Sequence, residues 1–422
     1  MFIFNIEMNK IEKSAKVVFY LVILALLIGG IAKFGDMQFV DVKKGNSNPF
    51  ANNRDFGIST LDLDAYNNLP LRQVQEISND FSLLAQKGFY YQPWVQVSEP
   101  LFKSKNVNIL TDETGLVIRH TFNPDNTSNY PVYKVYVFGS SCTFGYNVSD
   151  SQTICTYLSH ELNQNIKSRG IKAHVEVVNY GRAFYDASME MQLYMDLLKL
   201  GHRPSLSIFL SGVTPGLAMD IPYCTDVMIN EMYQVQFGDY QNTSTSLSNS
   251  SSFLERLGLV ASGEKGNSRI NIAIEEEDNP RIDFFANRFA QNKEIIKHLS
   301  DIYKVKCLFF AQPNPHYNYP VQFLKDSSSY EAEERIMWGQ LYDLLLPKHS
   351  DIISLHFLFK KWNKKAIVDY SHYSPGFNRF IAQEVCSHIP IDTLWTHPYK
   401  LDSMNATGLK RNLARRIFEM SQ

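Results

Sequence analysis

The fold of this chain is constrained most by a regular alternation of strand and helix patterns that begins near residue 132. An apolar run rich in β-branched and aromatic residues, Val132 to Phe138, predicts a strand that stops at Gly139. In the helix expected after it, Ile154, Leu158 and Leu162 recur every four residues and share one face. Strands that alternate with helices imply a mostly parallel sheet covered on both faces. The pattern therefore predicts an α/β protein with three layers, α/β/α.

The sheet is expected to be five-stranded and mostly parallel. Its predicted strands are Val132–Phe138, His174–Val178, Leu206–Leu210, Val305–Phe310 and the short run Ala366–Val368. Helices are expected to start near Ser149 or Asp150, after Gly181, near residue 283, near Ser328 and after Pro375-Gly376. Because the loops after parallel strands lie together at the carboxyl edge of the sheet, we expect a ligand site there.

The rest of the chain surrounds this region. We expect residues 132–395 to form the main domain, preceded by a linker and N-terminal extension at 36–131 and followed by a tail at 396–422. A stretch rich in Ser, Thr and Asn interrupts the main domain at about 240–282. Its composition is typical of an exposed insertion, either a solvated loop or a lid over the site.

Residues 1–35 contain a candidate membrane segment. Val17 to Ala32 is 16 residues without a charge, bracketed by Lys16 and Lys33. A helix of this length covers roughly 24 Å, slightly less than the ~30 Å hydrocarbon core, and snorkelling lysines can make up the difference. An uncleaved anchor is favoured, with a cleaved signal peptide ending at Gly30-Ile31-Ala32 and a buried core helix as alternatives. An anchor or a signal places the following domain outside the cytoplasm, in the periplasm or at the cell surface.

Composition argues against several classes of function. The net charge of −2 gives no concentrated basic face, so nucleic-acid binding is not expected. The sequence has no Walker loop, dinucleotide fingerprint or zinc-type His/Cys spacing, so we expect no cofactor and no metal. The five cysteines are scattered without a CxxC pair, so no disulfide framework is predicted. Sequons for N-glycosylation, relevant only in a host that glycosylates secreted proteins, occur at Asn126, Asn147, Asn242, Asn249 and Asn405.

Three loops at the expected carboxyl edge carry groups that can act together. The first, Gly139 to Gly145, has small residues that allow a sharp turn and expose a hydroxyl. The second is Asp369-Tyr370-Ser371-His372, where the carboxylate can hold imidazole Nδ1–H and leave Nε2 to take a proton from a serine. The third is Asn179-Tyr180-Gly181, whose glycine lets a backbone N–H approach a substrate oxygen. Each loop is a weak signal alone, and a role for His372 as a helix cap is the alternative for the second.

Over roughly residues 90–390 the sequence resembles the SGNH, or GDSL-like, hydrolase superfamily. The segment VYVFGSSCTFG resembles the family's block I, VVNYGRAF its block II and AIVDYSHYSPGFNRFIA its block V. The resemblance implies that Ser141 is the nucleophile and that Asp369 and His372 complete a catalytic triad. It places Gly181 in the oxyanion hole, and it implies the family's α/β/α fold and a hydrolase acting on ester bonds.

One block departs from the family pattern. Block III falls on SIFLSGVTPG, residues 207–216, where similar members carry D-G-x-N-D. Thr214 takes the position of the asparagine that completes the oxyanion hole, and its hydroxyl is a shorter donor that also accepts hydrogen bonds. Loss of one oxyanion donor costs roughly 3–4 kcal/mol of transition-state stabilisation. A catalytically weak or inactive domain that binds a glycan or a partner protein therefore stays as an alternative.

The favoured function is a serine-dependent hydrolase of an O-acyl (acetyl-type) ester. The expected substrate is an acylated carbohydrate, such as an extracytoplasmic polysaccharide, or another small ester, and an O-acyltransferase is a further alternative. Cys142 is the rival nucleophile, but neighbouring residues on a turn point in different directions, so it is expected to pack beneath the loop. In this hypothesis residues 17–32 anchor the protein in a membrane and the catalytic domain is extracytoplasmic.

Overall fold

The computed structural model describes much of the expected main domain and part of the segment before it. The described residues are 61–66, 69–92, 96–212, 280–315, 317, 319–323, 339, 342–343, 349, 351–369, 371–391 and 398–401. The candidate membrane segment at 17–32, Thr214, Ser328 and most of the polar insertion lie outside them. Among the described residues, no helix combines the length and the apolar character needed to cross a bilayer.

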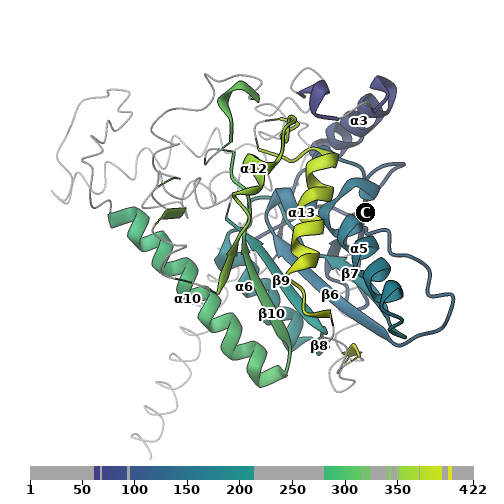
Figure 1. Cartoon of the computed structure of the whole chain (residues 1–422), viewed down its shortest axis with the longest axis vertical. Helices are drawn as coiled ribbons and strands as arrows, with labels where there is room; N and C mark the ends of the chain where they lie inside the picture. Colours follow the sequence, from purple (N-terminus) through teal and green to yellow (C-terminus); the bar gives the residue numbers. More distant parts are fainter. Residues whose placement is uncertain are drawn as a thin grey trace, which may run out of the picture.

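An eight-stranded mixed sheet forms the centre of the molecule (Figure 1). Its strand order is β11-β10-β9-β6-β7-β5-β4-β3. The strands are β3 (Phe102–Lys103), β4 (Asn108–Thr111), β5 (Val117–Arg119), β6 (Val132–Gly139), β7 (His174–Asn179), β9 (Leu206–Ser211), β10 (Lys306–Ala311) and β11 (Ile352–Ser354). The strands from β11 to β7 pair in parallel, whereas β5, β4 and β3 pair antiparallel.

The α/β class is confirmed, and the first four predicted strands are confirmed within one residue at each end. The expectation of a mostly parallel sheet of five strands is wrong, because β3 to β5 add antiparallel strands from the segment before residue 132. The fifth predicted strand is also wrong. Residues 366–368 form no strand, and Ile367 makes only an isolated bridge to Tyr373. The parallel edge strand is β11 instead.

Helices cover both faces of the parallel part of the sheet (Figure 1). α5 (Ile154–Ser168) and α13 (Pro375–Ser387) lie side by side on one face, and α6 (Ala187–Lys199) and α10 (Pro280–Tyr303) on the other. Alternate residues of β6 point into the two hydrophobic cores, one on each face of the sheet. Val135 and Val137 pack with α5 and α13, and Tyr136 and Phe138 pack with α6 and α10. The three-layer arrangement follows from this burial on both faces.

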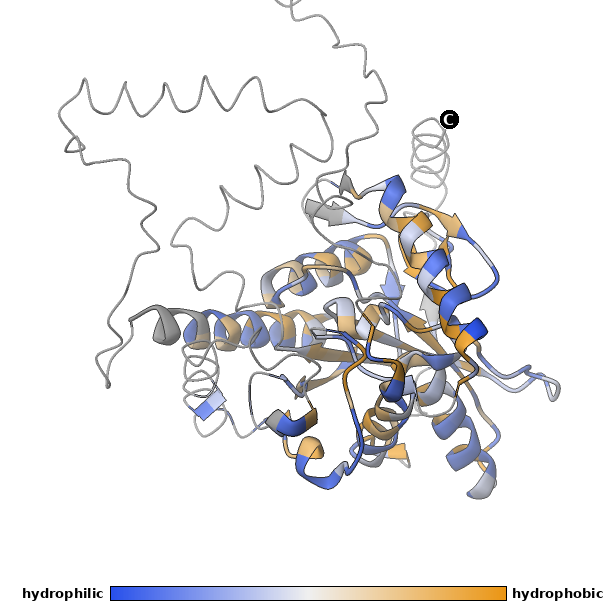
Figure 2. Cartoon of the chain, turned by 90° about the horizontal axis from the view of Figure 1, so that it is seen from above, coloured by the Kyte–Doolittle hydropathy of each residue, from blue (hydrophilic) through white to orange (hydrophobic). Residues whose placement is uncertain are grey.

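The helices begin at short polar residues. Thr153 caps α5, Asp186 caps α6 and Ser374 caps α13, where Pro375 occupies the first turn. Their buried faces carry the apolar residues expected from the spacing, among them Ile154, Leu158 and Leu162 in α5 and Met189, Leu193 and Leu197 in α6. Figure 2 shows hydrophilic and hydrophobic residues alternating along the helices, as expected for helices with one buried face.

The remaining elements surround this centre. They are η2 (Leu63–Tyr66), α3 (Leu71–Lys87), β1 (Tyr90–Gln92) paired with β2 (Gln96–Ser98), α4 (Ser141–Phe144), η3 (Asp150–Gln152), β8 (His202–Arg203) paired with β12 (Lys400–Leu401), η5 (Val321–Phe323) and α12 (Leu358–Lys361). α3 matters for the site, because its buried face, including Phe81, packs in one cluster with Phe144 and Tyr146 of the segment after β6. The N-terminal extension therefore supports the carboxyl edge of the sheet.

Candidate active site

The first expected loop begins after Gly139, the last residue of β6, where only glycine fits. Gly139 has a φ of +157°, and a Cβ there would lie 2.7 Å from the Leu210 carbonyl oxygen and clash with α4. Ser140 is extended, and the single turn of α4 follows directly. This strand–turn–helix leaves Ser141 half-buried, whereas Ser140 and Cys142 are only 1% and 2% exposed.

The neighbours of Ser141 have other partners. The Ser140 hydroxyl accepts a hydrogen bond from Gln312 Nε2 at 3.1 Å. The Cys142 thiol donates to the Ser371 carbonyl at 3.3 Å, and burial raises the pKa of this thiol far above its ordinary value. A buried, protonated thiol is a poor nucleophile. Cys142 thus packs beneath the turn, and Ser141 has the most accessible side chain of the three.

Asp369 and His372 form a hydrogen-bonded pair in the turn before α13. His372 Nδ1 lies 2.6 Å from Asp369 Oδ2, and the backbone N–H groups of Ser371 and His372 both donate to Asp369 Oδ1 at 2.8 Å. Burial acts to raise the pKa of Asp369, but the facing His372 and these hydrogen bonds outweigh it and hold that pKa below its ordinary value. The ionised carboxylate can therefore orient the imidazole. The cap of α13 is Ser374, so the helix-cap alternative for His372 does not apply.

The two turns touch each other. The contact between Cys142 Sγ and the Ser371 carbonyl joins the residue after Ser141 to the residue before His372. The Tyr146 ring stacks on the His372 imidazole, with ring centroids 5.4 Å apart and planes 25° apart. Within the described residues, His372 bonds Asp369 but makes no hydrogen bond to the Ser141 hydroxyl. Catalytic bonds of this kind often tighten only in the substrate complex.

Gly181 lies against α4, but its N–H already has a partner. A Cβ at Gly181 would lie 2.8 Å from the Thr143 carbonyl carbon, so only glycine allows this approach. The Gly181 N–H donates to Asn179 Oδ1 at 2.9 Å, and Asn179 Nδ2 donates to the carbonyls of Thr143 and Phe144 at 3.0 and 3.3 Å. The oxyanion role of Gly181 stays a prediction, as does that of Thr214, which lies outside the described residues.

A buried acid that contacts the last residue of β9 is a feature that sequence reasoning missed. Glu190, in the first turn of α6, is 1% exposed and accepts a hydrogen bond from the Ser211 hydroxyl. Burial raises the pKa of Glu190 to about 8, although the bond from Ser211 opposes the shift. The signal is present in the sequence, because Glu190 precedes Leu193 and Tyr194 by three and four residues on an otherwise apolar face.

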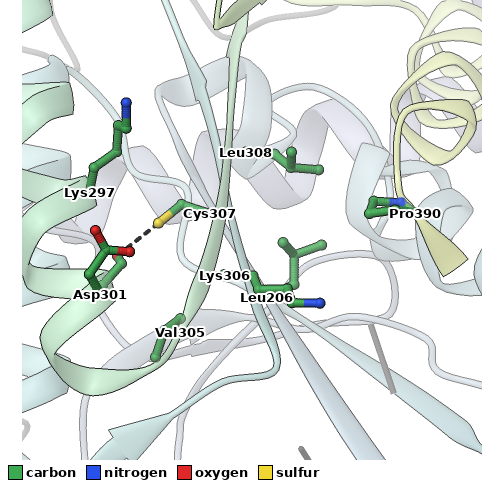
Figure 3. Close-up of a pocket in the computed structure, with 9 residues that line it drawn as sticks. Leu206, Lys297, Asp301, Val305, Lys306, Cys307, Leu308 and Pro390 are labelled. Atoms are coloured by element: carbon green, nitrogen blue, oxygen red, sulfur yellow. Dashed lines mark hydrogen bonds between the residues drawn. The ribbon is translucent and has the colours of Figure 1, made fainter. Parts of the chain in front are cut away.

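A cavity of about 300 Å³ lies elsewhere in the fold (Figure 3). Its lining includes Leu206 and Lys306, the first residues of β9 and β10. It also includes Ser300 and Cys307, whose Oγ and Sγ atoms are 2.7 Å apart. Parallel strands begin at the edge opposite to the one where Ser141 meets the Asp369–His372 turn. The cavity is therefore separate from the candidate active site.

No family model and no curated protein matches the chain. Several solved structures resemble it. TesA has 10% sequence identity and a TM-score of 0.31 over 60% of this chain and 94% of that chain. The psychrotrophic esterase EstA from Pseudoalteromonas sp. has 8% identity, a TM-score of 0.31 and the same coverages of 60% and 94%. A GDSL-like lipase from Bacteroides thetaiotaomicron has 10% identity and a TM-score of 0.26 over 64% of this chain and 91% of that chain. Likenesses this distant assign no function, which depends on the geometry of the site itself.

Proposed function

We propose that the protein is a serine-dependent hydrolase of carboxylic esters. The observation that carries the proposal is the 2.6 Å bond between His372 Nδ1 and Asp369 Oδ2, in a turn that touches the turn of Ser141. Ser141 is the nucleophile, His372 the general base and Asp369 the group that orients the imidazole. The protonated thiol of Cys142 supports serine over cysteine as the attacking residue.

In the proposed reaction the Ser141 hydroxyl oxygen attacks the acyl carbonyl carbon, and its proton passes to His372 Nε2. Asp369 stays ionised and stabilises the imidazolium through Nδ1–H. The bond between the acyl carbon and the alcohol oxygen then breaks, and His372 gives the proton to the leaving alcohol. A water molecule that loses a proton to His372 then attacks the acyl carbon. The bond between that carbon and Ser141 Oγ breaks, His372 returns the proton to Oγ, and the acid is released.

The tetrahedral oxyanion needs N–H donors close to Ser141. The backbone N–H of Ser141 itself is one proposed donor, and Gly181 and Thr214 are the others. Because the Gly181 N–H is bonded to Asn179 Oδ1 at 2.9 Å, it has to exchange that bond for one to the substrate.

Covalent labelling tests this assignment. A fluorophosphonate probe is expected to label the wild type but not Ser141→Ala, and hydrolysis of p-nitrophenyl acetate should fall at least about 10³-fold in the variant. Ser168→Ala is the matched control, because Ser168 is exposed and its hydroxyl donates, within the described part of the chain, to the helix carbonyl of Asn165 alone. A folded wild type that neither labels nor hydrolyses the ester would contradict the proposal.

A second candidate is a catalytically weak domain that binds a glycan or a partner protein. It is favoured by one observation, the Gly181 N–H that is bonded to Asn179. If Thr214→Asn raises ester turnover about tenfold, the site is an attenuated enzyme. If that variant stays inactive while Ser141→Ala still binds the glycan, the binding function is correct. An O-acyltransferase would instead give a larger yield of acylated product when a sugar alcohol competes with water.

The substrate and the location are further parts of the proposal. We propose an acetyl-type ester on an extracytoplasmic carbohydrate, with residues 17–32 as a membrane anchor. The support is the run of 16 uncharged residues at 17–32, ahead of the domain. The full chain is expected to stay with membranes after a carbonate wash and to be digested by protease added to spheroplasts. Recovery of the intact chain in the soluble fraction contradicts the anchor.

A further inference from the structure

The side chain of Asn147 bonds the acid of the candidate site. Asn147 Nδ2 lies 2.5 Å from Asp369 Oδ2, the same oxygen that lies 2.6 Å from His372 Nδ1. The other oxygen, Oδ1, accepts the backbone N–H groups of Ser371 and His372. Both oxygens of Asp369 are therefore engaged, and Asn147 supplies a donor from outside the Asp369–His372 turn.

The backbone after α4 sets the direction of this side chain. Asn147 has a φ of +59°, a left-handed conformation that asparagine adopts more easily than most residues. Its carbonyl accepts the Tyr66 hydroxyl at 2.7 Å, and the carbonyl of Val148 accepts Arg119 Nη2 at 3.1 Å. These two bonds hold the backbone of the turn without using the Asn147 side chain.

The orientation of the amide is set by chemistry. Asn147 is 3% exposed, and its Oδ1 has no hydrogen-bond partner among the described residues. The flipped amide would set this oxygen against the Asp369 carboxylate, and two acceptors cannot bond. A buried acceptor without a partner destabilises the folded chain. Stability alone therefore does not explain an amide here, whereas the bond from Nδ2 to Asp369 does.

We propose that Asn147 is a positioning residue that holds the Asp369 carboxylate against His372. This inference rests on the proposed function. With Oδ2 shared between Asn147 and His372, rotation of the carboxyl group is restricted, and the imidazole keeps Nε2 directed away from Asp369. Tyr146, the preceding residue, stacks on the same imidazole. The segment that carries the nucleophile Ser141 thus also aligns its base.

Asn147→Gly tests the proposal, because glycine keeps the left-handed backbone and the carbonyl that Tyr66 binds. We expect kcat for p-nitrophenyl acetate to fall about tenfold while KM stays within about twofold, similar to the loss when a residue that hydrogen-bonds and orients a metal ligand is removed. Asn129→Gly is the matched control, since Asn129 is an exposed asparagine at a φ of +50°, and it should keep wild-type kcat. An unchanged kcat in Asn147→Gly, or a change in KM alone, overturns the proposal.

A double-mutant cycle separates positioning from a structural role. In an Asp369→Ala background, Asn147→Gly should have no further effect on kcat, because Asn147 acts through the carboxylate. A second tenfold loss in that background shows that Asn147 acts independently of Asp369, and it overturns the proposal.

The side-chain amide of Asn147 gives a readout that needs no activity and no folded Asn147 variant. In ¹⁵N-labelled wild type, one Nδ2 proton bonded to a carboxylate should resonate downfield, and its shift should move in Asp369→Ala while the Asn129 amide does not. An inactive wild type with this displaced resonance contradicts only the proposed function. An active wild type without it overturns the role of Asn147 and leaves the proposed function standing.

Discussion

At the scale of single residues, Glu190 couples the stability of the fold to pH. Its pKa in the folded protein is about 8, against an ordinary value of 4.5, because the side chain is buried. Between these values the folded state holds a proton that the unfolded state has lost. The free energy of unfolding therefore decreases as the pH rises through this window, and the buried carboxyl is tolerated best in mild acid.

Glu190→Gln should remove this dependence, because the amide has no proton to lose and still accepts the Ser211 hydroxyl. We expect the wild type to lose about 1 kcal/mol per pH unit relative to the variant between about pH 5 and pH 8. Urea unfolding at three pH values measures the difference. The control is Glu294→Gln on α10, where the side chain is 50% exposed, and it should follow the wild type. Equal slopes for wild type and Glu190→Gln contradict the prediction.

At the scale of elements, the turn between β6 and α4 depends on Gly139. A Cβ there meets the Leu210 backbone in β9, and backbone cannot move aside as a flexible side chain can. Gly139→Ala should lower the free energy of unfolding by about 2–4 kcal/mol and slow fluorophosphonate labelling of Ser141.

The matched control for that variant is Gly170→Ala. Gly170 also has a positive φ, +67°, but an added Cβ would meet nothing within 4 Å. Gly170→Ala should lower the free energy of unfolding by only about 1 kcal/mol and leave the labelling of Ser141 unchanged. Denaturant midpoints and labelling rates of the two variants provide the comparison. Similar losses in both would show that backbone conformation alone, without the contact to β9, sets the requirement for glycine.

The parallel elements could be predicted because each carries its own signal. β6, β9 and β10 are runs of six to eight largely apolar residues, β7 has three valines among its six residues, and the helices between them repeat apolar positions on one face. β3 to β5 and β11 have only two to four residues, and their partners in the sheet define them. Ala366–Val368 is buried and apolar like a strand, but it pairs with His372 to Ser374 across the turn that follows it.

In the candidate site, too, some features could be predicted from the sequence and others could not. Ser141, Asp369 and His372 could be singled out because their segments resemble blocks I and V of the SGNH hydrolases, and the fold brings the two turns together. The bond from Gly181 N–H to Asn179 and the bond from Ser211 to Glu190 could not be placed. Both bonds depend on the direction in which a buried side chain points, and the spacing of residues in the sequence does not predict that direction.

At the scale of the whole molecule, the N-terminal extension is part of the structure that shapes the site. Arg119 in β5 forms a 2.5 Å ion pair with Asp150, and the two side chains are 0% and 2% exposed. Glu99 accepts the Ala183 N–H at 2.7 Å beside the Gly181 turn. The segment before residue 132 therefore supports two of the loops that form the carboxyl edge of the sheet.

Arg119→Met measures how much the ion pair between Arg119 and Asp150 contributes to the free energy of unfolding. The variant leaves the Asp150 carboxylate buried without its cation, so we expect a loss of about 3–5 kcal/mol in the free energy of unfolding. Arg72→Met is the control, because the Arg72–Glu76 pair on α3 is 90% and 31% exposed and should contribute less than about 1 kcal/mol. Urea unfolding gives both values, and comparable losses would show that the buried pair adds nothing specific.

The burial of Asn147 also bears on how the protein can be produced. Asn147-Val148-Ser149 is a sequon, and the nitrogen that an oligosaccharide would occupy is the one bonded to Asp369. A cell that attaches N-glycans during translocation meets this asparagine before the chain has folded around it. A sugar added at that moment cannot be accommodated at a position that is 3% exposed in the finished fold. Bacterial expression avoids that modification. In a eukaryotic secretory host, part of the product would carry the sugar and could not form the bond between Asn147 and Asp369.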